Sequence, residues 1–221
     1  MKVLVFGATG MVGQGVLREC LLSPKVETVV SLGRNATGQH DPKLRELVHK
    51  DLFDYSAIEP EMSGFDACFF CLGVSSAGMK EADYRHITYD LTLAAANILV
   101  KLNPGMTFIY VSGTGTDSSE RGRVMWARVK GATENALLRL PFKSAYMFRP
   151  GVIVPIHGVR SKTRLYQAVY SVTGPLPRML YRFFPKYMTS SELLGRAMIV
   201  AGEKGAPKGI LETSDINALG S

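Results

Sequence analysis

The stretch KVLVFGATGMVG, residues 2–13, decides the fold of this chain. Residues 2–6 form a short run rich in strand-forming apolar types, and residues 14–22 suit a helix. The order strand, glycine-rich turn, helix is the context in which a GxxGxxG pattern holds the pyrophosphate of a dinucleotide. A glycine-rich turn that holds no ligand is the alternative interpretation of the same pattern.

Each glycine of the pattern has its own physical use. Gly7 allows the tight turn out of the strand, and Gly10 has no Cβ, so its backbone can approach a phosphate. Gly13 lets the helix pack close to the strand. The N-terminus of the helix then offers free N–H groups and the positive end of its dipole to an anion.

Strand and helix signals alternate along the rest of the chain. Further strands are predicted at residues 26–32, 47–50, 66–73, 106–111, 144–148 and 209–212, and helices at residues 81–102, 123–140 and 193–202. The tail after Asn217 is expected to fray. The alternation predicts an α/β fold, a doubly wound parallel sheet, in a single Rossmann domain of residues 1–221. Within it, residues 152–190 are expected to form a small helical cap or substrate-side segment.

The composition is that of a globular protein of ordinary polarity. Apolar residues make up 46% and charged residues 20% of the chain, and no apolar run reaches the roughly 18–20 residues that span a bilayer. The first apolar run ends at Gly7 without a cleavage pattern, so no signal peptide is expected. Three cysteines, an odd number, predict reduced thiols and a cytoplasmic location. Cys68 and Cys71 fall on opposite faces of a strand and are expected to be core residues rather than metal ligands.

The net charge of +7 suits an anionic partner. No dense run of Lys and Arg and no zinc-finger or helix-turn-helix spacing is present, so no nucleic-acid partner is expected. Residues 135–191 combine basic and aromatic side chains and contain no Asp or Glu. This stretch is interpreted as a substrate cap, as a surface for peripheral membrane or protein docking, or as an amphipathic cap whose aromatic residues are core.

The residues after the second predicted strand bear on the choice between NAD and NADP. A carboxylate near this position accepts hydrogen bonds from the ribose 2′-OH of NAD, but no acidic residue lies between Glu27 and Asp41. Arg34 instead suits the 2′-phosphate of NADP, and the alternative is a solvated surface arginine. Asn35 and Arg45 are candidates for assisting Arg34. The sequence therefore favours NADP (NADPH) over NAD as cofactor.

Six segments in the first 152 residues resemble the atypical short-chain dehydrogenase/reductases, in particular the bacterial relatives of the mammalian HIV Tat-interacting protein 30. They are GATGMVG (7–13), LGR (32–34), CLGVSS (71–76), VSG (111–113), VKG (129–131) and FRPGV (148–152). This NAD-dependent epimerase/dehydratase-like group has NAD(P)-binding Rossmann domains. The resemblance implies cofactor contacts by Gly7, Thr9, Gly10, Met11, Val12, Gly13, Arg34, Asp51, Leu52, Gly73 and Lys130. For Asp51, a turn or helix-cap role is the alternative.

The family that the sequence resembles uses three catalytic groups. A Ser or Thr after the fifth strand holds the substrate oxygen, a Tyr transfers the proton, and a Lys four residues later holds the nicotinamide ribose and lowers the pKa of the Tyr. Ser112 and Lys130 match this pattern, with Thr114 as a second candidate for the Ser, but Trp126 stands at the Tyr position. An indole N–H donates a hydrogen bond but is no acid near neutral pH.

Three interpretations of Trp126 are open. The protein binds NADP(H) without catalysis; or Tyr84, Thr114 or a water held by Ser112 supplies the proton; or Trp126 packs over the cofactor in a repurposed fold. We expect an oxidoreductase that transfers hydride to a small carbonyl- or quinone-like acceptor of unnamed identity. The alternative is a non-catalytic NADP(H) sensor or scaffold that acts through the basic-aromatic C-terminal surface. Arg149, after the sixth strand, either faces an anionic substrate or is a surface residue of a turn.

Overall fold

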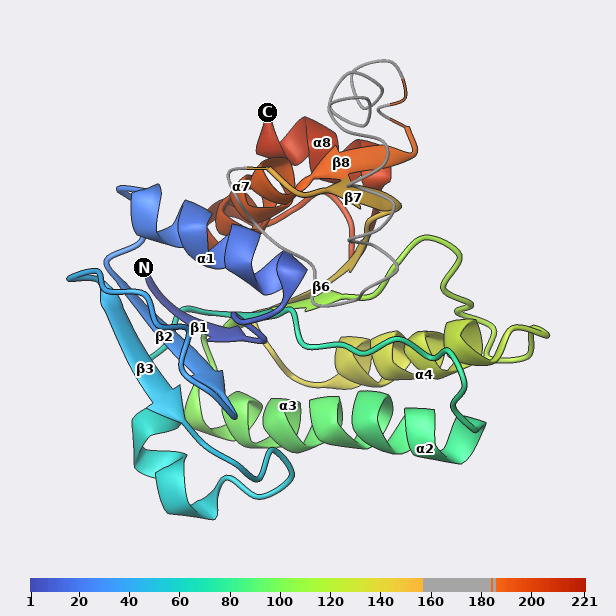
Figure 1. Ribbon diagram of the computed structural model, residues 1–221, viewed down its shortest axis with the longest axis horizontal. Helices are drawn as coiled ribbons and strands as arrows, with labels where there is room; N and C mark the ends of the chain where they lie inside the picture. Colours follow the sequence, from blue (N-terminus) through green and yellow to red (C-terminus); the bar gives the residue numbers. More distant parts are fainter. Residues whose placement is uncertain (157–183, 185) are drawn as a thin grey trace.

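Seven parallel strands form the sheet at the centre of the molecule (Figure 1). The computed structural model describes residues 1–156, 184 and 186–221. The strand order is β3-β2-β1-β4-β5-β6-β9, and all neighbouring strands are parallel. The strands are β1 (Lys2–Phe6), β2 (Thr28–Gly33), β3 (Leu44–Val48), β4 (Ala67–Phe70), β5 (Thr107–Val111), β6 (Ser144–Arg149) and β9 (Ile210–Glu212). The predicted doubly wound parallel sheet is confirmed.

The strand β1 shows why the sheet is covered on both faces. Val3 and Val5 belong to the core cluster on one face, and Leu4 and Phe6 belong to the cluster on the other. A parallel strand that is apolar on both faces needs helices on both. The chain order reverses between β1 and its neighbour β4, and a reversal of this kind leaves a crevice at the carboxyl ends of the strands.

Two layers of helices enclose the sheet (Figure 1). One layer holds α1 (Met11–Leu22), α7 (Ser191–Lys204) and α8 (Thr213–Gly220). The other holds the 3-10 helix η1 (Ser56–Met62), α2 (Glu81–Arg85), the π-helical segment η2 (His86–Asp90), α3 (Leu91–Leu102) and α4 (Met125–Arg139). The predicted helix over residues 81–102 is therefore continuous and contains one π-helical stretch. Among the described residues, no helix combines the length and apolar character needed to cross a bilayer.

The expected cap of residues 152–190 is described only at its two ends. There, β7 (Val152–Val154) and β8 (Met188–Ser190) pair as a parallel two-stranded sheet. Residues 157–183 and 185, which carry the expected helices and most of the basic-aromatic stretch, lie outside the described residues. The helical cap therefore stays a prediction.

The boundaries of the third strand and of the C-terminal tail are among those that differ from the sequence prediction. The third strand begins at Leu44 rather than at residue 47, because it pairs in register with β2 from that point. The tail after Asn217, expected to fray, instead belongs to α8. A Cβ at Gly220 would lie 2.2 Å from the carbonyl oxygen of Leu193, so α8 packs directly on α7. Tertiary packing thus orders a segment whose local sequence gives no such signal.

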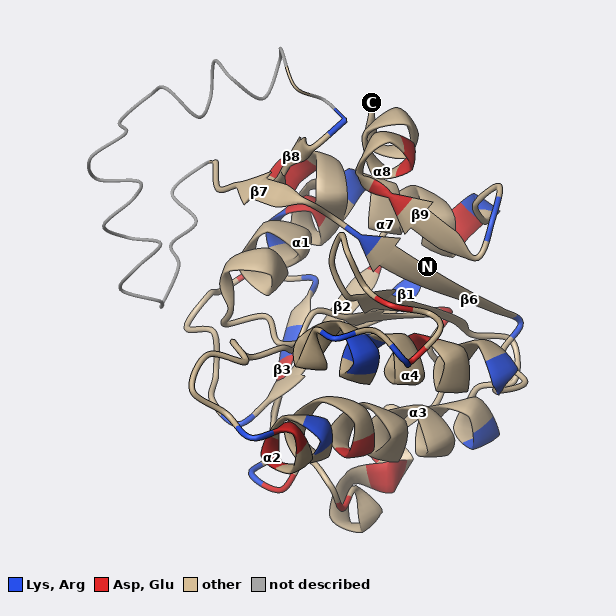
Figure 2. Ribbon diagram, turned by 90° about the vertical axis from the view of Figure 1, so that its right-hand side faces the viewer, with Lys and Arg blue, Asp and Glu red and all other residues tan. Residues whose placement is uncertain are grey.

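Charged residues of both signs lie on the helices of the described part (Figure 2). Arg128 on α4 pairs with Glu81 on α2 at 2.6 Å, and Lys25 pairs with Glu203 at 3.1 Å. Part of the positive charge of the described residues is thus offset by neighbouring carboxylates.

Gly131 sets the distance between α4 and the loop after β5. A Cβ at Gly131 would lie 1.8 Å from the carbonyl oxygen of Asp117. Because backbone must move to admit it, we expect Gly131→Ala to lower the free energy of unfolding by about 1–3 kcal/mol, measured by urea denaturation. Gly105→Ala is the matched control, since a Cβ there meets nothing within 4 Å. Equal losses in the two variants would contradict this packing.

Candidate functional site

The three glycines of the N-terminal pattern lie where the end of β1 meets the start of α1. Gly7 has φ +78, and a Cβ on it would lie 2.7 Å from the backbone nitrogen of Leu72. A Cβ on Gly13 would lie 2.1 Å from the carbonyl oxygen of Gly7, so α1 approaches the strand at a distance that only glycine permits. Gly10 donates its N–H to the same carbonyl at 2.9 Å and closes the turn.

A cleft of about 240 Å³ opens beside this turn, at the carboxyl ends of β1, β2 and β4. Its lining comprises Gly7, Ala8, Thr9, Gly10, Ser31, Leu32, Gly33, Arg34, Asn35, Leu52, Cys71, Leu72, Gly73 and Val74. The helix α1 begins at the cleft with no acidic residue in its first turn and no side-chain cap, so its first N–H groups are available to an anion. The narrow turn and these donors fit the pyrophosphate of a dinucleotide.

Met11 and Val12 begin α1 but do not line the cleft. The side chain of Val12 packs against the apolar core, so its main-chain N–H is the group that can serve a ligand. Gly73 lies on the open side of the cleft, because a Cβ there would meet nothing within 4 Å.

A second cavity, of about 510 Å³, continues from the first and shares Arg34 and Leu52 with it. Lys50 also lines this cavity, and its Nζ donates to the main-chain carbonyl of Arg34 at 2.7 Å. Two basic residues therefore line this cavity, with the ammonium of Lys50 at the main chain of Arg34. Asp51 accepts a hydrogen bond from the N–H of Phe53 at 2.9 Å, so it acts as a turn residue as well as lining the cavity.

Arg45, a candidate for assisting Arg34, takes a different place. Its guanidinium pairs with Glu61, and it does not line either cavity. Lys50, which the sequence analysis did not single out, is the basic residue that the structure puts beside Arg34.

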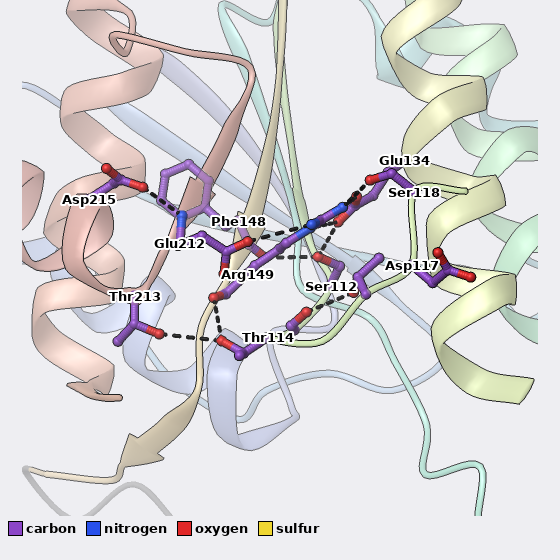
Figure 3. Close-up of polar contacts among 12 residues, drawn as sticks. Ser112, Thr114, Asp117, Ser118, Glu134, Phe148, Arg149, Glu212, Thr213 and Asp215 are labelled. Carbon is purple, nitrogen blue, oxygen red and sulfur yellow. Dashed lines mark hydrogen bonds and ion pairs between the residues drawn. The ribbon is translucent and has the colours of Figure 1, made fainter. Parts of the chain in front are cut away.

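A buried polar network holds together the ends of β5 and β6 and the middle of α4 (Figure 3). The hydroxyl of Ser112 donates to the carboxylate of Glu134 at 2.5 Å, and Glu134 is fully buried. Arg149 donates to the same carboxylate through Nε at 3.0 Å and also through Nη2. The carboxylate of Glu134 therefore receives both the hydroxyl proton of Ser112 and the guanidinium of Arg149.

Arg149 is not a surface residue, so that expectation is wrong, and its guanidinium is engaged with Glu134. It is 9% exposed, and its remaining donors reach Ser118 at 2.6 Å and Glu212 at 3.5 Å. Burial by itself lowers the pKa of Arg149, and the hydrogen bonds and charge of Glu134 more than offset this, so the pKa is raised. A buried guanidinium needs a buried carboxylate, and Glu134 supplies it.

Lys130 and Trp126 lie one helical turn apart on α4, as their spacing predicts. The ammonium of Lys130 donates to the carbonyl of Ser112 at 2.8 Å, which places it at the end of β5. Trp126 packs against the same loop, 3.6 Å from the position of a Cβ on Gly115. The residues of the expected catalytic group thus meet around this loop. Of the expected cofactor residues, seven line the two cavities: Gly7, Thr9, Gly10, Arg34, Asp51, Leu52 and Gly73. Four do not: Met11, Val12, Gly13 and Lys130.

Glu134 is the residue of this site that the sequence analysis missed. It follows Lys130 by four positions, on a helix face with Ala132, Thr133 and Leu137 that is buried. An acidic residue on an otherwise apolar helix face is the signal that would have found it, because such a residue needs a buried cation.

The NAD dependent epimerase/dehydratase family matches residues 3–120. The chain belongs to this family. The matched residues run from β1 to the loop after β5, so they include the glycine turn and both cavities.

The curated relatives described here are fungal rather than bacterial. Protein fmp52-2, mitochondrial, of Aspergillus terreus is 25% identical over 225 residues, which is 98% of this chain and 95% of that protein. Protein FMP52, mitochondrial, of Debaryomyces hansenii is 28% identical over 212 residues, 92% of this chain and 88% of that protein. Their names contradict the cytoplasmic location expected above, and that expectation is wrong.

The cysteines do not identify the compartment of this protein, for a physical reason. Cys20 and Cys68 are fully buried, and burial raises the pKa of both thiols. A buried, protonated thiol is inert, so its reduced state does not report the compartment.

Two solved structures with bound NAD share the fold. MoeE5 in complex with UDP-glucose and NAD superimposes with a TM-score of 0.68 at 16% identity, over 95% of this chain and 74% of that one. The Bordetella bronchiseptica enzyme WbmH in complex with NAD+ gives a TM-score of 0.65 at 14% identity, over 96% and 73%. Identity at this level shows the fold alone.

The buried pair predicts a large effect on stability. Glu134→Ala leaves the Arg149 guanidinium buried without its carboxylate, and we expect a loss of about 3–5 kcal/mol in the free energy of unfolding by chemical denaturation. Glu81→Ala removes the partner of Arg128 on the surface, where the Glu81 side chain is 49% exposed, and serves as the control with a loss below about 1 kcal/mol. A cost for Glu134→Ala as small as the control would show that the pair is not needed for stability.

Proposed function

We propose that the protein is an NADP(H)-dependent oxidoreductase of the short-chain type that transfers hydride to a small carbonyl- or quinone-like acceptor. The observation that carries the proposal is the glycine turn at the start of α1, open to two joined cavities with Arg34 and Lys50 at their edge. Membership of an NAD-dependent family and the resemblance to bacterial relatives of the HIV Tat-interacting protein 30 support it.

Each region of the site would hold one part of the cofactor. The N–H groups at Met11 and Val12 would hold the pyrophosphate at the start of α1, next to the turn that Gly10 closes. Leu52, which lines both cavities, would contact the adenine side. Lys130 at the end of β5 would hold the nicotinamide ribose.

The preference for NADP rests on Arg34 and Lys50. Among the described residues, no carboxylate pairs with either side chain, and the hydrogen bond from Lys50 to the main-chain carbonyl of Arg34 keeps the Lys50 ammonium beside the Arg34 backbone. A phosphate between two cations forms charge-assisted hydrogen bonds that a ribose hydroxyl cannot match.

The chain's own residues define what the site does to an acceptor. A bound nicotinamide supplies or accepts the hydride. Ser112 and Lys130 lie at the end of β5, where they would orient the acceptor and the ribose. Trp126 packs on the loop after β5 and covers one side of this region.

A second function is favoured by Trp126 itself. Because an indole cannot act as an acid, a non-catalytic NADP(H) sensor or scaffold accounts for the lost tyrosine without a substitute donor. The surface through which such a protein would act, the basic-aromatic stretch, lies largely in residues 157–183 and 185, outside the described residues.

Cofactor preference is tested by titration with NADPH and NADH, followed by the emission of Trp126, the one tryptophan of the chain. We expect NADPH to bind more tightly than NADH. Arg34→Ala removes charge-assisted hydrogen bonds, so the Kd for NADPH should rise about 10- to 100-fold, with the Kd for NADH changed less than about threefold. Arg45→Ala is the matched control, because Arg45 is paired with Glu61 away from the cavities. Equal affinity of the native protein for both cofactors would remove the case for NADP.

Catalysis is tested by NADPH oxidation in the presence of a phenanthrenequinone, with the native protein and with Trp126→Tyr. We expect the native protein to oxidise NADPH and the variant to change kcat by less than about tenfold, within the range of one general-acid contribution. Oxidation by the variant alone would show that the native protein has lost the family's proton donor and would favour the sensor. The absence of turnover in both would contradict the oxidoreductase proposal, whatever the Kd for NADPH.

A further inference from the structure

An acceptor reduced at the end of β5 needs a proton, and the described residues there offer few sources. The hydroxyl proton of Ser112 is directed at Glu134, 2.5 Å away, and Arg149 holds that carboxylate from the other side. Toward the site, the hydroxyl of Ser112 can therefore only accept a hydrogen bond, unless it breaks its bond to the buried carboxylate of Glu134.

The other candidate hydroxyl donors either already donate a hydrogen bond to another group or are buried. Thr114 donates to the main-chain carbonyl of Arg149 at 3.0 Å. Tyr84 and Tyr110 are 2% and 1% exposed, and burial raises the pKa of both phenols. Trp126 has no acidic proton near neutral pH.

Among the described residues at the end of β5, Lys130 is the remaining group with a transferable proton. Its ammonium has three N–H bonds, and the structure gives it two carbonyl partners, Ser112 at 2.8 Å and Val111 at 3.5 Å. Among the described residues, no carboxylate lies within ion-pair distance of Lys130. The contact with Val111 is at the limit of hydrogen-bond distance, so only the N–H that serves Ser112 is firmly engaged. The other two can serve the nicotinamide ribose and an acceptor, at the turn of α4 that follows Trp126.

We propose that Lys130 is the proton donor of this protein and takes the place of the tyrosine that Trp126 replaces. The proposal rests on the proposed hydride transfer. The carbonyl carbon of the acceptor takes the hydride, the electron pair of the C=O bond moves to oxygen, and a proton passes to that oxygen as an N–H bond of Lys130 breaks. The neutral amine then recovers a proton from water, and the product is the alcohol. An ortho-quinone gives the hydroxyketone in this step, and its tautomer, formed as the carbon-bound hydrogen leaves as a proton and the second oxygen takes one up from water, is the hydroquinone.

The surroundings of Lys130 make it a stronger acid than an exposed lysine. Burial lowers the pKa of Lys130 to about 8, and the charge of Glu134 opposes this shift. The ionisable groups around it are Glu134 on α4, the ring of Tyr110 on β5 at 5.7 Å, and Arg149 on β6 behind Glu134. A general acid whose pKa lies near the working pH transfers its proton efficiently.

The first test is made on the native protein without cofactor. The Cε–Hε signals of the lysines are followed by NMR from pH 6 to pH 11, and the Lys130 signal is identified by its loss in Lys130→Arg. We expect this signal to titrate near pH 8 while exposed lysines titrate at about 10.4. A Lys130 signal that titrates with the exposed lysines would overturn the proposal.

The second test compares kcat and Kd. With NADPH and a phenanthrenequinone, the kcat of the native protein should be level below the pH at which Lys130 titrates and should fall about tenfold per unit above it, because only the ammonium donates. Lys130→Arg keeps the charge but cannot release a proton at these pH values. We expect it to lower kcat by about 100-fold or more and to flatten the pH profile, with the Kd for NADPH within about threefold of the native value.

Lys130→Met removes both the positive charge and the transferable proton, so it should lose affinity for NADPH as well as turnover. Comparison with Lys130→Arg then separates the effect of the charge from that of the proton. Lys101→Arg, on the exposed end of α3, is the matched control and should leave both unchanged. If Lys130→Arg retains kcat, or if kcat of the native protein stays level through the titration of Lys130, the proton comes from elsewhere and the oxidoreductase proposal stands without this one. A native protein that binds NADPH but reduces no quinone removes the proposed function and this inference together. The dependence of the native protein's kcat on pH tests Lys130 as the proton donor even where a variant does not fold.

Discussion

The close approach of α1 to the end of β1 is the constraint on which the nucleotide site depends. A Cβ at Gly13 would lie 2.1 Å from the carbonyl oxygen of Gly7, so the helix begins at the strand end with its N–H groups facing the crevice. The crevice exists because the strand order reverses between β1 and β4. Strand order, glycine positions and helix start therefore act as one unit, and the family match covers the residues that build it.

The second half of the site depends on a different interaction, the buried pair of Glu134 and Arg149. It connects α4 with β6 and, through Ser112, with the end of β5. Pairs of this kind contribute little net stability but are costly to break, because either partner alone is a buried charge. The pair also fixes the direction of the Ser112 proton. Among the described residues of this region, Lys130 is then the group that we propose as donor, while Trp126 packs on the loop beside it.

The sequence predicted the sheet and the glycine turn at the start of α1. Apolar strands and glycine spacing are local signals, as is Ser190, which caps α7 by accepting from the N–H of Leu193 at 3.0 Å. Pairings between distant segments carried no local signal. Arg149 meets Glu134 only because β6 and α4 pack together, and Lys50 meets Arg34 only because β3 lies beside β2. The order of α8 likewise comes from its packing on α7 rather than from its own sequence.

The central claim is that the glycine turn and the two joined cavities hold one NADP molecule whose reactive end reaches Lys130. A crystal structure of the protein grown with NADP+ tests it most directly. The account predicts the pyrophosphate at the first N–H groups of α1, the 2′-phosphate between Arg34 and Lys50, and the nicotinamide ribose within hydrogen-bond distance of Lys130. Density for the dinucleotide elsewhere, or a 2′-phosphate that points away from both cations, would contradict it.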